Sequence, residues 1–329
     1  MEDGADISYE RLVDRTNIWD AWKTFVRGKW RQRAVVEFWQ EQEKELALLY
    51  HDLNAGSYQH GPYHRFTVEE SKRREVSVAR VRDRVVHQMV ATYLERKFAK
   101  HFYRQSYCAQ RGKGVSGARM YALRLIRQLS GRHQVWVGKL DVEQYFSNID
   151  HAILLKLLAR RINDAKIMAL CQEIIGSFGN GGRALPLGNL TSQWFANVYL
   201  HEVDWYVKHT LKIPYYLRYN DDMILIDTNR QNVADWINAL RQFVADRLRL
   251  TIPQRKVSLI GLPQAVDILG LATNGQRMWV RGATVERAHA HSRMKASALA
   301  PELLDTLSSY CGCGINQPFS VTDLIDAYA

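Results

Sequence analysis

Two apolar strands joined by a turn that carries adjacent acids are the feature that most constrains this chain. Residues 215–219 and 222–226 read as two strands, with Asn220 and Asp221 between them and Asp222 at the start of the second. Asn and Asp favour such tight turns because they tolerate unusual backbone angles. Adjacent carboxylates between apolar strands repel each other, and a bound cation would offset that cost. The pattern therefore predicts a hairpin with a cation site at its turn.

A second candidate acid lies 80 residues before Asp221, at the end of another apolar run. Residues 135–142 read as a buried strand that places Asp141 near its C-terminal end. Phosphoryl transfer to a sugar hydroxyl needs two divalent cations ~4 Å apart. Mg²⁺ is bound by a few carboxylates plus substrate phosphates, so acids from two separate strands fit that chemistry. Taken alone, an Asp after a strand is more often a cap or turn residue.

A third Asp in this part of the chain is better explained by helix capping. Asp150 directly precedes the apolar run at residues 151–158, which reads as a helix. A carboxylate at this position accepts the free N–H groups of the first helical turn. We therefore leave Asp150 outside the catalytic set.

Positive charge is concentrated in one part of the chain. The sequence carries a formal net charge of +11, and residues 58–115 hold thirteen Lys/Arg against five Asp/Glu, a surplus of eight. A basic region of this kind is the electrostatic footprint of a polyanionic partner, for which nucleic acid is the first candidate. From charge alone, a solvated charged surface is the alternative.

Helical and extended patterns segregate along the chain rather than alternate, which is typical of an α+β fold. Apolar residues at helical intervals predict helices over residues 18–53, 82–100, 194–206 and 233–248. Residues 66–78 read as a strand, a polar turn and a returning strand, and short strands are expected around Val257 and Ile268.

The composition disfavours membrane and disulfide-rich classes. No apolar run approaches the ~18 residues that suggest a membrane span, and the acidic N-terminus lacks the order of a signal peptide. We therefore expect a cytoplasmic protein with no membrane partner. The four cysteines are too few and too scattered for a disulfide framework. Cys311 and Cys313 form a lone C-x-C without a second pair at zinc spacing, so they read as ordinary thiols.

The strings around these acids resemble motifs of reverse transcriptases. Tyr219-Asn-Asp-Asp222 resembles the Y-x-D-D box, and residues 139–151 resemble the preceding aspartate motif in its bacterial form. Residues 187–193, Leu-Gly-Asn-Leu-Thr-Ser-Gln, are similar to the [I/V/L]-G-x-x-x-S-Q form of diversity-generating retroelement enzymes. Group II intron and retron enzymes typically carry Q-G-x-x-x-S-P there. Residues 82–88 and 111–114 support the same subgroup, and the resemblance spans roughly residues 30 to 272.

The resemblance implies an α+β right-hand polymerase with fingers, an antiparallel-sheet palm and a small helical thumb. The boundaries that follow are an N-terminal helical extension over residues 1–57, fingers over 58–115 and 150–182, a palm over 116–149 and 183–272, and a thumb over 273–329.

Carried over by position, the resemblance also implies the site residues. The metal ligands are Asp141, Val142, Asp221 and Asp222, and the catalytic set is Asp141, Asp221, Asp222 and Lys256, with Lys256 as a proton donor to the departing pyrophosphate. Residues near the incoming nucleotide, the template or the nascent base pair are Lys72, Arg74, Arg111, Phe146, Leu187, Gly188, Gln193 and Tyr219. The ring of Phe146 would clash with a ribose 2′-OH and so select deoxynucleotides, with plain core packing as the alternative. We expect Asp141 and Asp221 to carry the reaction, and Asp222 to be a helper or structural acid of the turn.

The function implied is an RNA-directed DNA polymerase that copies a template-repeat RNA into cDNA, with errors at adenines that diversify a target gene. The cofactors are two Mg²⁺ ions, with Mn²⁺ as a substitute. The partners are the template RNA, a DNA or cDNA primer, dNTPs and a small basic oligomeric accessory protein, and the gene is expected in bacteria, archaea or phage. The alternatives are a group II intron-like or antiviral-defence reverse transcriptase, and an RNA-binding module that has lost catalysis. The full set of acids argues against the last.

Overall fold

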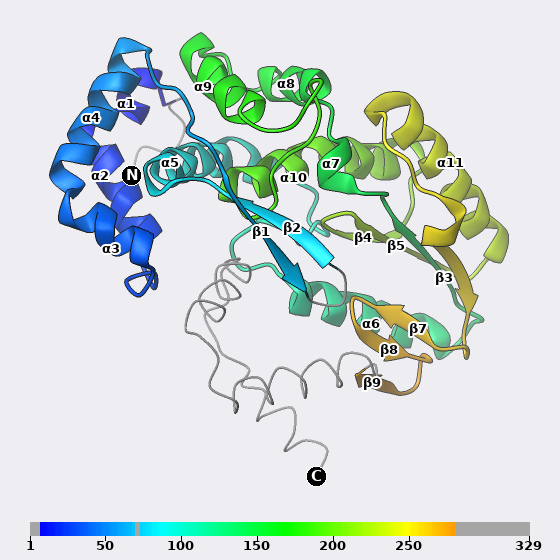
Figure 1. Ribbon diagram of the computed structural model, residues 1–329. Coiled ribbons are helices and arrows are strands. Elements are labelled where there is room, and N and C mark those ends of the chain that lie inside the picture. The colour runs from blue at the N-terminus through cyan, green and yellow to red at the C-terminus, as the bar shows by residue number, and fades with distance from the viewer. Residues whose placement is uncertain (1–6, 70–72, 281–329) are drawn as a thin grey trace. The chain divides into compact units, whose positions relative to one another are not determined.

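The computed structural model describes residues 7–69 and 73–280 of the chain (Figure 1). The chain divides into two compact units, and each is described by itself. The first unit comprises residues 1–103, 143–202 and 244–250, and the second comprises residues 104–142, 203–243 and 251–329. Helices and antiparallel sheets are both present, as expected for an α+β fold.

The second unit is built on a four-stranded antiparallel sheet with the strand order β4-β5-β3-β6. Its strands are β3 (Trp136–Asp141), β4 (Tyr215–Tyr219), β5 (Asp222–Asp227) and β6 (Val257–Gly261). A smaller sheet contains β7 (Val266–Ile268), β8 (Leu271–Thr273) and β9 (Met278–Val280). The helices are α6 (Val115–Ser130), the π-helix η2 (Tyr206–Thr210), α11 (Arg230–Leu248), whose last residues belong to the first unit, and the 3-10 helix η3 (Gln254–Lys256).

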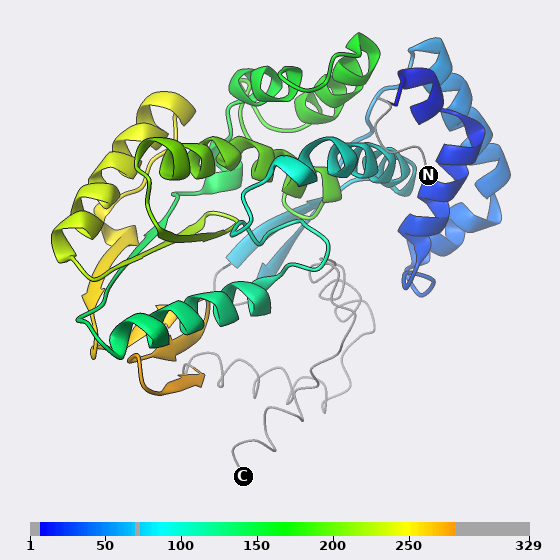
Figure 2. The same cartoon turned by 180° about the vertical axis from the view of Figure 1, so that it is seen from behind.

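Helices cover both faces of the four-stranded sheet. On one face Val137, Leu217 and Ile224 pack against α6 in a buried apolar cluster. On the other face Gly138 lies so close to α11 that a Cβ at this position would be 2.6 Å from Cγ1 of Val233. Figures 1 and 2 show α6 and α11 on opposite sides of the strands. Each buried aliphatic side chain contributes roughly 1.5–3 kcal/mol, so this double cover holds the sheet firmly.

The first unit is mainly helical. Its elements are α1 (Tyr9–Leu12), α2 (Arg15–Val26), α3 (Arg33–Gln40), α4 (Gln42–Ala55), β1 (His64–Glu69), β2 (Arg73–Val78), α5 (Val81–Phe98), the 3-10 helix η1 (Ala99–His101), α7 (Tyr145–Asn148), α8 (His151–Ala159), α9 (Ala165–Gly176) and most of α10 (Leu190–Trp205). Buried Trp22 of α2, Leu49 of α4 and Met89 of α5 contribute to its core. The N-terminal helices α1 to α4 lie together, coloured blue in Figure 2.

The helix expected over residues 18–53 is three helices in the structure. The chain leaves α2 through Gly28, whose φ of 74° is left-handed, and re-enters helical geometry only at Arg33. A left-handed residue cannot continue a right-handed helix, so this prediction was wrong in its continuity. The two strands expected within residues 66–78 are confirmed as β1 and β2, and the helix expected over 82–100 is confirmed as α5 followed by η1.

Several elements lie outside the sequence expectations. Helices α6 and α9 were not predicted. Of the expected thumb, residues 278–280 form the strand β9, and residues 281–329, with Cys311 and Cys313, fall outside the described part of the chain. None of the helices within residues 7–69 and 73–280 is long and apolar enough to cross a membrane.

Candidate active site

Two of the predicted acids meet across the centre of the four-stranded sheet. Strands β3 and β5 pair antiparallel, and their register sets Asp141 directly opposite Asp222. Side chains alternate between the faces of a strand. Asp141 therefore shares a face with Val137, and Asp222 shares a face with Ile224, which is the face that α6 covers. The sheet thus brings together two acids from distant parts of the sequence.

The third acid, Asp221, lies in a two-residue turn. Tyr219 of β4 pairs with Asp222 of β5, so only Asn220 and Asp221 join the strands. Asn220 has a φ of 54°, in the left-handed region that Asn tolerates. Its side-chain amide donates a hydrogen bond to Oδ1 of Asp221 at 2.9 Å. The predicted turn is confirmed, and its Asn also orients the acid.

Burial and mutual repulsion make the turn acids hard to ionise. The pKa of Asp221 is raised to about 7, by burial first and then by the charges of Asp141 and Asp222. A hydrogen-bonding interaction with Asp141, which favours the protonated form, raises the pKa of Asp221 further. The pKa of Asp222 is raised to about 6, again by burial first and then by Asp141, although Lys139 and Lys256 act in the opposite direction. The three acids form one electrostatic cluster.

Lys256, at the end of η3, contacts two of the predicted metal ligands. Its Nζ lies 3.0 Å from Oδ2 of Asp141 and donates a hydrogen bond to the carbonyl oxygen of Val142 at 2.8 Å. Both the lysine and Asp141 are partly exposed, with side-chain exposures of 21% and 34%. The ammonium group is therefore placed as a positive charge at the accessible edge of the acid cluster.

The donors present fit a hard divalent cation. Within the described residues, no three Asp, Glu, His or Cys side chains are arranged closely enough to enclose a metal ion as they stand. The cluster nevertheless offers carboxylate and carbonyl oxygens, which are the ligands of Mg²⁺. The raised pKa values of Asp221 and Asp222 measure a repulsion that a cation would relieve. The residues that would hold it are Asp141, Asp221, Asp222 and the carbonyl of Val142.

The turn between β7 and β8, at residues 267–270, is tied to this sheet. Lys139 of β3 pairs with Asp267 at 3.2 Å between Nζ and Oδ2. The other oxygen of Asp267 accepts the N–H of Gly270 at 2.8 Å, which closes the β7–β8 turn. Nε of Arg119 in α6 donates to the carbonyl of Leu269 at 2.9 Å. Sequence reasoning did not assign Lys139 or Arg119 to these contacts.

In the first unit, the segment that begins at Leu187 docks on the strand β2. The carbonyl of Leu187 accepts the N–H of Ser77 at 2.9 Å. Asn189 is buried and donates from its side-chain amide to the carbonyl of Ser77 at 2.7 Å, while its Oδ1 accepts the N–H of Ala79 at 3.1 Å. Gly188 has a φ of 108°, and a Cβ there would lie 2.8 Å from Cγ1 of Val76. The structure therefore gives Gly188 a packing reason to be glycine.

The remaining predicted residues are distributed over both units. In the first, Arg74 is exposed on β2, Gln193 is half-buried on α10, and Phe146 is half-buried on α7, edge-to-face with Tyr145 at 5.5 Å between ring centroids. In the second, Arg111 is exposed and Tyr219 packs against the apolar cluster under α6. Lys72 lies outside the described residues.

Sequence reasoning missed a buried polar group next to the turn. Arg218 is fully buried on β4, and Nε and an NH2 nitrogen of its guanidinium reach the carboxylate of Asp204 at 2.8 and 2.5 Å. The available signal was a charged residue in the middle of an apolar strand, which is rarely buried unless it is paired.

Comparison of the sequence with known protein families gives a match. The sequence profile of the family "Reverse transcriptase (RNA-dependent DNA polymerase)" matches residues 64–273, well over half of the chain. Protein YkfC of Escherichia coli (strain K12) is 30% identical over 176 residues, which cover 50% of this chain and 45% of YkfC. The group II intron-encoded protein LtrA of Lactococcus lactis subsp. cremoris is 25% identical over 175 residues, covering 50% of this chain and 28% of LtrA. The matched segment thus spans less than half of the length of either relative.

A solved structure shows the same fold. Telomerase from Candida albicans, determined in complex with a fragment of telomeric RNA, superposes with a TM-score of 0.52 at 12% sequence identity, covering 74% of this chain and 51% of that one. At this identity the likeness concerns the fold alone, which is the right-hand polymerase fold expected from the sequence. With a family match over residues 64–273, this chain belongs to the reverse transcriptase (RNA-dependent DNA polymerase) family.

Proposed function

We propose that this chain is an active RNA-directed DNA polymerase in which Asp141 and Asp221 carry a two-metal phosphoryl transfer. The observation that carries the proposal is the strand register, which sets Asp141 opposite Asp222 and so next to Asp221 in the turn, together with the raised pKa of Asp221. Membership of the reverse transcriptase family supports it. A carboxyl pair with such unfavourable repulsion persists more readily where cations bind it.

The residues of the acid cluster have separate tasks in this proposal. Asp141, Asp221 and the carbonyl of Val142 hold the cations, and Asp222 assists from the start of β5. When bound, two Mg²⁺ ions would activate the attacking 3′-hydroxyl and stabilise the leaving oxygen. Lys256, held by Asp141 and Val142, keeps a proton at the accessible edge of the cluster, where it can pass to the departing pyrophosphate.

A primer-extension assay with an RNA template and Mg²⁺ tests the proposal. Asp221→Asn and Asp141→Asn should each lower the extension rate by roughly 10²–10³-fold or more, because a preorganised electrostatic group at the reacting centre is lost. Asp150→Asn is the matched control, since Asp150 is the N-cap of α8 and accepts the N–H of Ile153 at 3.1 Å. Its extension rate should stay close to that of the wild type. Unchanged extension by Asp221→Asn would end the proposal.

We further propose that the enzyme copies a template-repeat RNA with errors at adenines, in the manner of diversity-generating retroelements. The support is the form of the segment from Leu187 to Gln193 and its docking on β2. Leu187 and Arg74 are the residues whose substitution should alter the errors. Sequencing of cDNA made in vitro tests this proposal, and an error spectrum without an excess at template adenines would reject it. A small basic oligomeric accessory protein belongs to the same proposal.

A group II intron-like enzyme is the second candidate function. The similarity to LtrA, a group II intron-encoded protein, favours it. The two candidates differ in what lies beside the gene, because a template/variable repeat pair indicates diversification and an intron RNA indicates the alternative. Accurate copying of adenines by the purified protein would also favour the intron-like function.

A further inference from the structure

A buried arginine lies directly next to the turn that holds Asp221. Arg218 is in β4, two residues before Asn220, and its side chain has 1% exposure. Its backbone N–H donates to the carbonyl of Gln105 at 3.0 Å, and its carbonyl accepts the N–H of Tyr107 at 2.9 Å. The chain around Ser106 therefore pairs with β4 at the outer side of the sheet, and Arg218 is fixed at both its backbone and its side chain.

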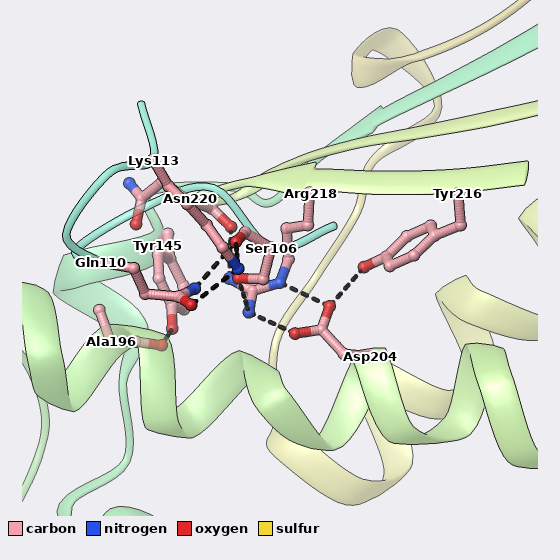
Figure 3. Close-up of polar contacts among 9 residues, drawn as sticks. All are labelled: Ser106, Gln110, Lys113, Tyr145, Ala196, Asp204, Tyr216, Arg218 and Asn220. Carbon is pink, nitrogen blue, oxygen red and sulfur yellow. Dashed lines mark hydrogen bonds and ion pairs between the residues drawn. The ribbon is translucent and has the colours of Figure 1, made fainter. Parts of the chain in front are cut away.

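The guanidinium group reaches Asp204, Asn220 and Ser106 in different directions (Figure 3). It pairs with Asp204, a carboxylate with no exposed surface. A second nitrogen, NH1, donates to the carbonyl oxygen of Asn220 at 3.0 Å, and NH2 also donates to Oγ of Ser106 at 3.1 Å. A rigid planar fork can satisfy such a set, whereas a single point charge cannot.

Asp204 also accepts a hydrogen bond from a second residue of β4. The hydroxyl of Tyr216 donates to Oδ1 of Asp204 at 2.9 Å. Burial first, and then the charge of Asp204, raise the pKa of Tyr216 well above its ordinary value, so Tyr216 stays protonated and remains a donor. Asp204 thus neutralises Arg218 and leaves the NH1 nitrogen of the guanidinium to hold the turn.

Two hydrogen bonds link Arg218, through Asn220, to the candidate catalytic acid Asp221. Arg218 holds the backbone carbonyl of Asn220, and the side chain of Asn220 holds Oδ1 of Asp221 at 2.9 Å. Asn220 has a left-handed φ of 54°. The hydrogen bond from Arg218 to its carbonyl oxygen therefore restrains the backbone of the turn. A defined path of hydrogen bonds therefore runs from the buried ion pair to Asp221.

The Arg-Gly-Lys-Gly motif at residues 111–114 connects to the same group. Nζ of Lys113 donates to the carbonyl of Ser106 at 3.0 Å and to Oε1 of Gln110 at 2.8 Å. Nε2 of Gln110 donates to the same carbonyl of Ser106 at 2.8 Å. Ser106 is fully buried, so the motif braces the residue whose hydroxyl accepts from Arg218.

We infer that Arg218 is a positioning residue that fixes the Asn220–Asp221 turn for cation binding. The inference rests on the proposed role of Asp221 as a metal ligand. Its competitor is a purely structural role, in which Arg218 only neutralises buried Asp204. The two differ in what a folded variant does, because positioning predicts weaker cation binding and a structural role predicts unchanged binding.

Arg218→Lys separates the two roles. It keeps a positive charge beside Asp204 but loses the fork that reaches Asn220 and Ser106. We expect the folded variant to bind Mn²⁺ roughly 10–100-fold more weakly in an electron paramagnetic resonance titration, the usual effect of removing a group that orients a metal ligand. In primer extension, kcat should fall by a similar factor, with a smaller change in KM for dNTP. Wild-type Mn²⁺ affinity in the folded variant would overturn the inference.

Two further variants keep the result interpretable. Ser106→Ala removes one partner of the guanidinium without leaving a charge unpaired, and should weaken Mn²⁺ binding in the same direction by a smaller factor. If Arg218→Lys does not fold, wild-type Mn²⁺ affinity of Ser106→Ala would overturn the inference. Arg160→Lys is the matched control, because Arg160 pairs with Glu202 of the helix α10 at 2.7 Å on the surface, and its Mn²⁺ affinity should equal that of the wild type.

The same experiment separates this inference from the proposed function. A wild-type chain that binds Mn²⁺ but extends no primer would reject the polymerase activity, and the Mn²⁺ affinities would still decide the role of Arg218. A wild-type chain that binds no Mn²⁺ at these acids would reject both.

Discussion

The contribution of Asp221 to the free energy of unfolding should fall as the pH rises from about 4 to about 7. Its pKa is raised to about 7 in the folded chain from an ordinary value of 3.8. Between these values the folded state keeps a proton that the unfolded state has lost. Since the unfolded state binds fewer protons, the free energy of unfolding decreases with pH in this window. The stability that Asp221 contributes is fully present below pH 4 and is lost as the pH rises through about 7.

The size of the effect follows from the shift. Each extra proton held by the folded state lowers the free energy of unfolding by about 1.4 kcal/mol per pH unit. A shift of about three units then amounts to on the order of 4 kcal/mol for Asp221. Asp222, with a pKa raised to about 6, adds to the same slope over a narrower range.

Urea denaturation of wild type and Asp221→Asn at pH 4, 5.5 and 7 measures this contribution. Carboxylates outside the cluster titrate in the same way in both proteins, so their effects cancel in the difference, which reports on Asp221 and its coupling to Asp141 and Asp222. Asp221→Asn should gain stability relative to the wild type as the pH rises, by an amount of the order worked out above. A difference that stays constant from pH 4 to pH 7 would refute the reasoning.

Asp150 supplies a control of opposite sign. The N–H of Ile153 and the guanidinium of Arg249, at 2.8 Å, lower the pKa of Asp150 despite its burial, which acts in the other direction. A carboxyl with a lowered pKa contributes stability above its unfolded pKa and loses it as the pH falls. Asp150→Asn should therefore lose stability relative to the wild type as the pH rises above 4, where Asp221→Asn gains it.

Two further substitutions have expected outcomes. Gly138→Ala places a Cβ 2.6 Å from Cγ1 of Val233, so the protein should lose about 1–3 kcal/mol of stability through overpacking, measured by urea denaturation; an unchanged midpoint would contradict the close packing of β3 on α11. Lys256→Met removes the ammonium group that contacts Asp141 and Val142, and single-turnover extension should slow by roughly 10²–10⁴-fold if it acts as a general acid. Wild-type extension by Lys256→Met would exclude that role.

The features predicted correctly from the sequence are those that depend on residues close by in the chain. The turn at Asn220 and Asp221 follows from two apolar strands and two turn-forming residues, and the cap at Asp150 follows from the apolar helix behind it. Each of these depends on neighbours a few positions away. The prediction that residues 18–53 form one helix was wrong because helical periodicity does not report the left-handed backbone at Gly28.

The ion pair of Arg218 and Asp204 could not be predicted in the same way. The two residues come from different elements, a strand and a helix, and their contact depends on how those elements pack. The docking of Asn189 on β2 is also a tertiary contact, since Asn189 and Ser77 lie 112 residues apart in sequence. Contacts between residues far apart in the chain are only weakly indicated by the sequence, here by one charged residue, Arg218, in an apolar strand.

The three acids of the cluster differ in how much each needs a cation. Asp141 has a counter-charge already, because Lys256 lies 3.0 Å from it. Burial and the charge of Asp141 raise the pKa of Asp222, whereas the charges of Lys139 and Lys256 lower it. The charges that act most strongly on Asp221 are those of Asp141 and Asp222, and both raise its pKa further. A divalent cation therefore relieves the largest repulsion at Asp221, which is why its loss should weaken Mn²⁺ binding more than the loss of Asp222. Asp221 is thus the acid with the strongest uncompensated repulsion, and its turn is the part of the site to which the buried Arg218 is hydrogen-bonded.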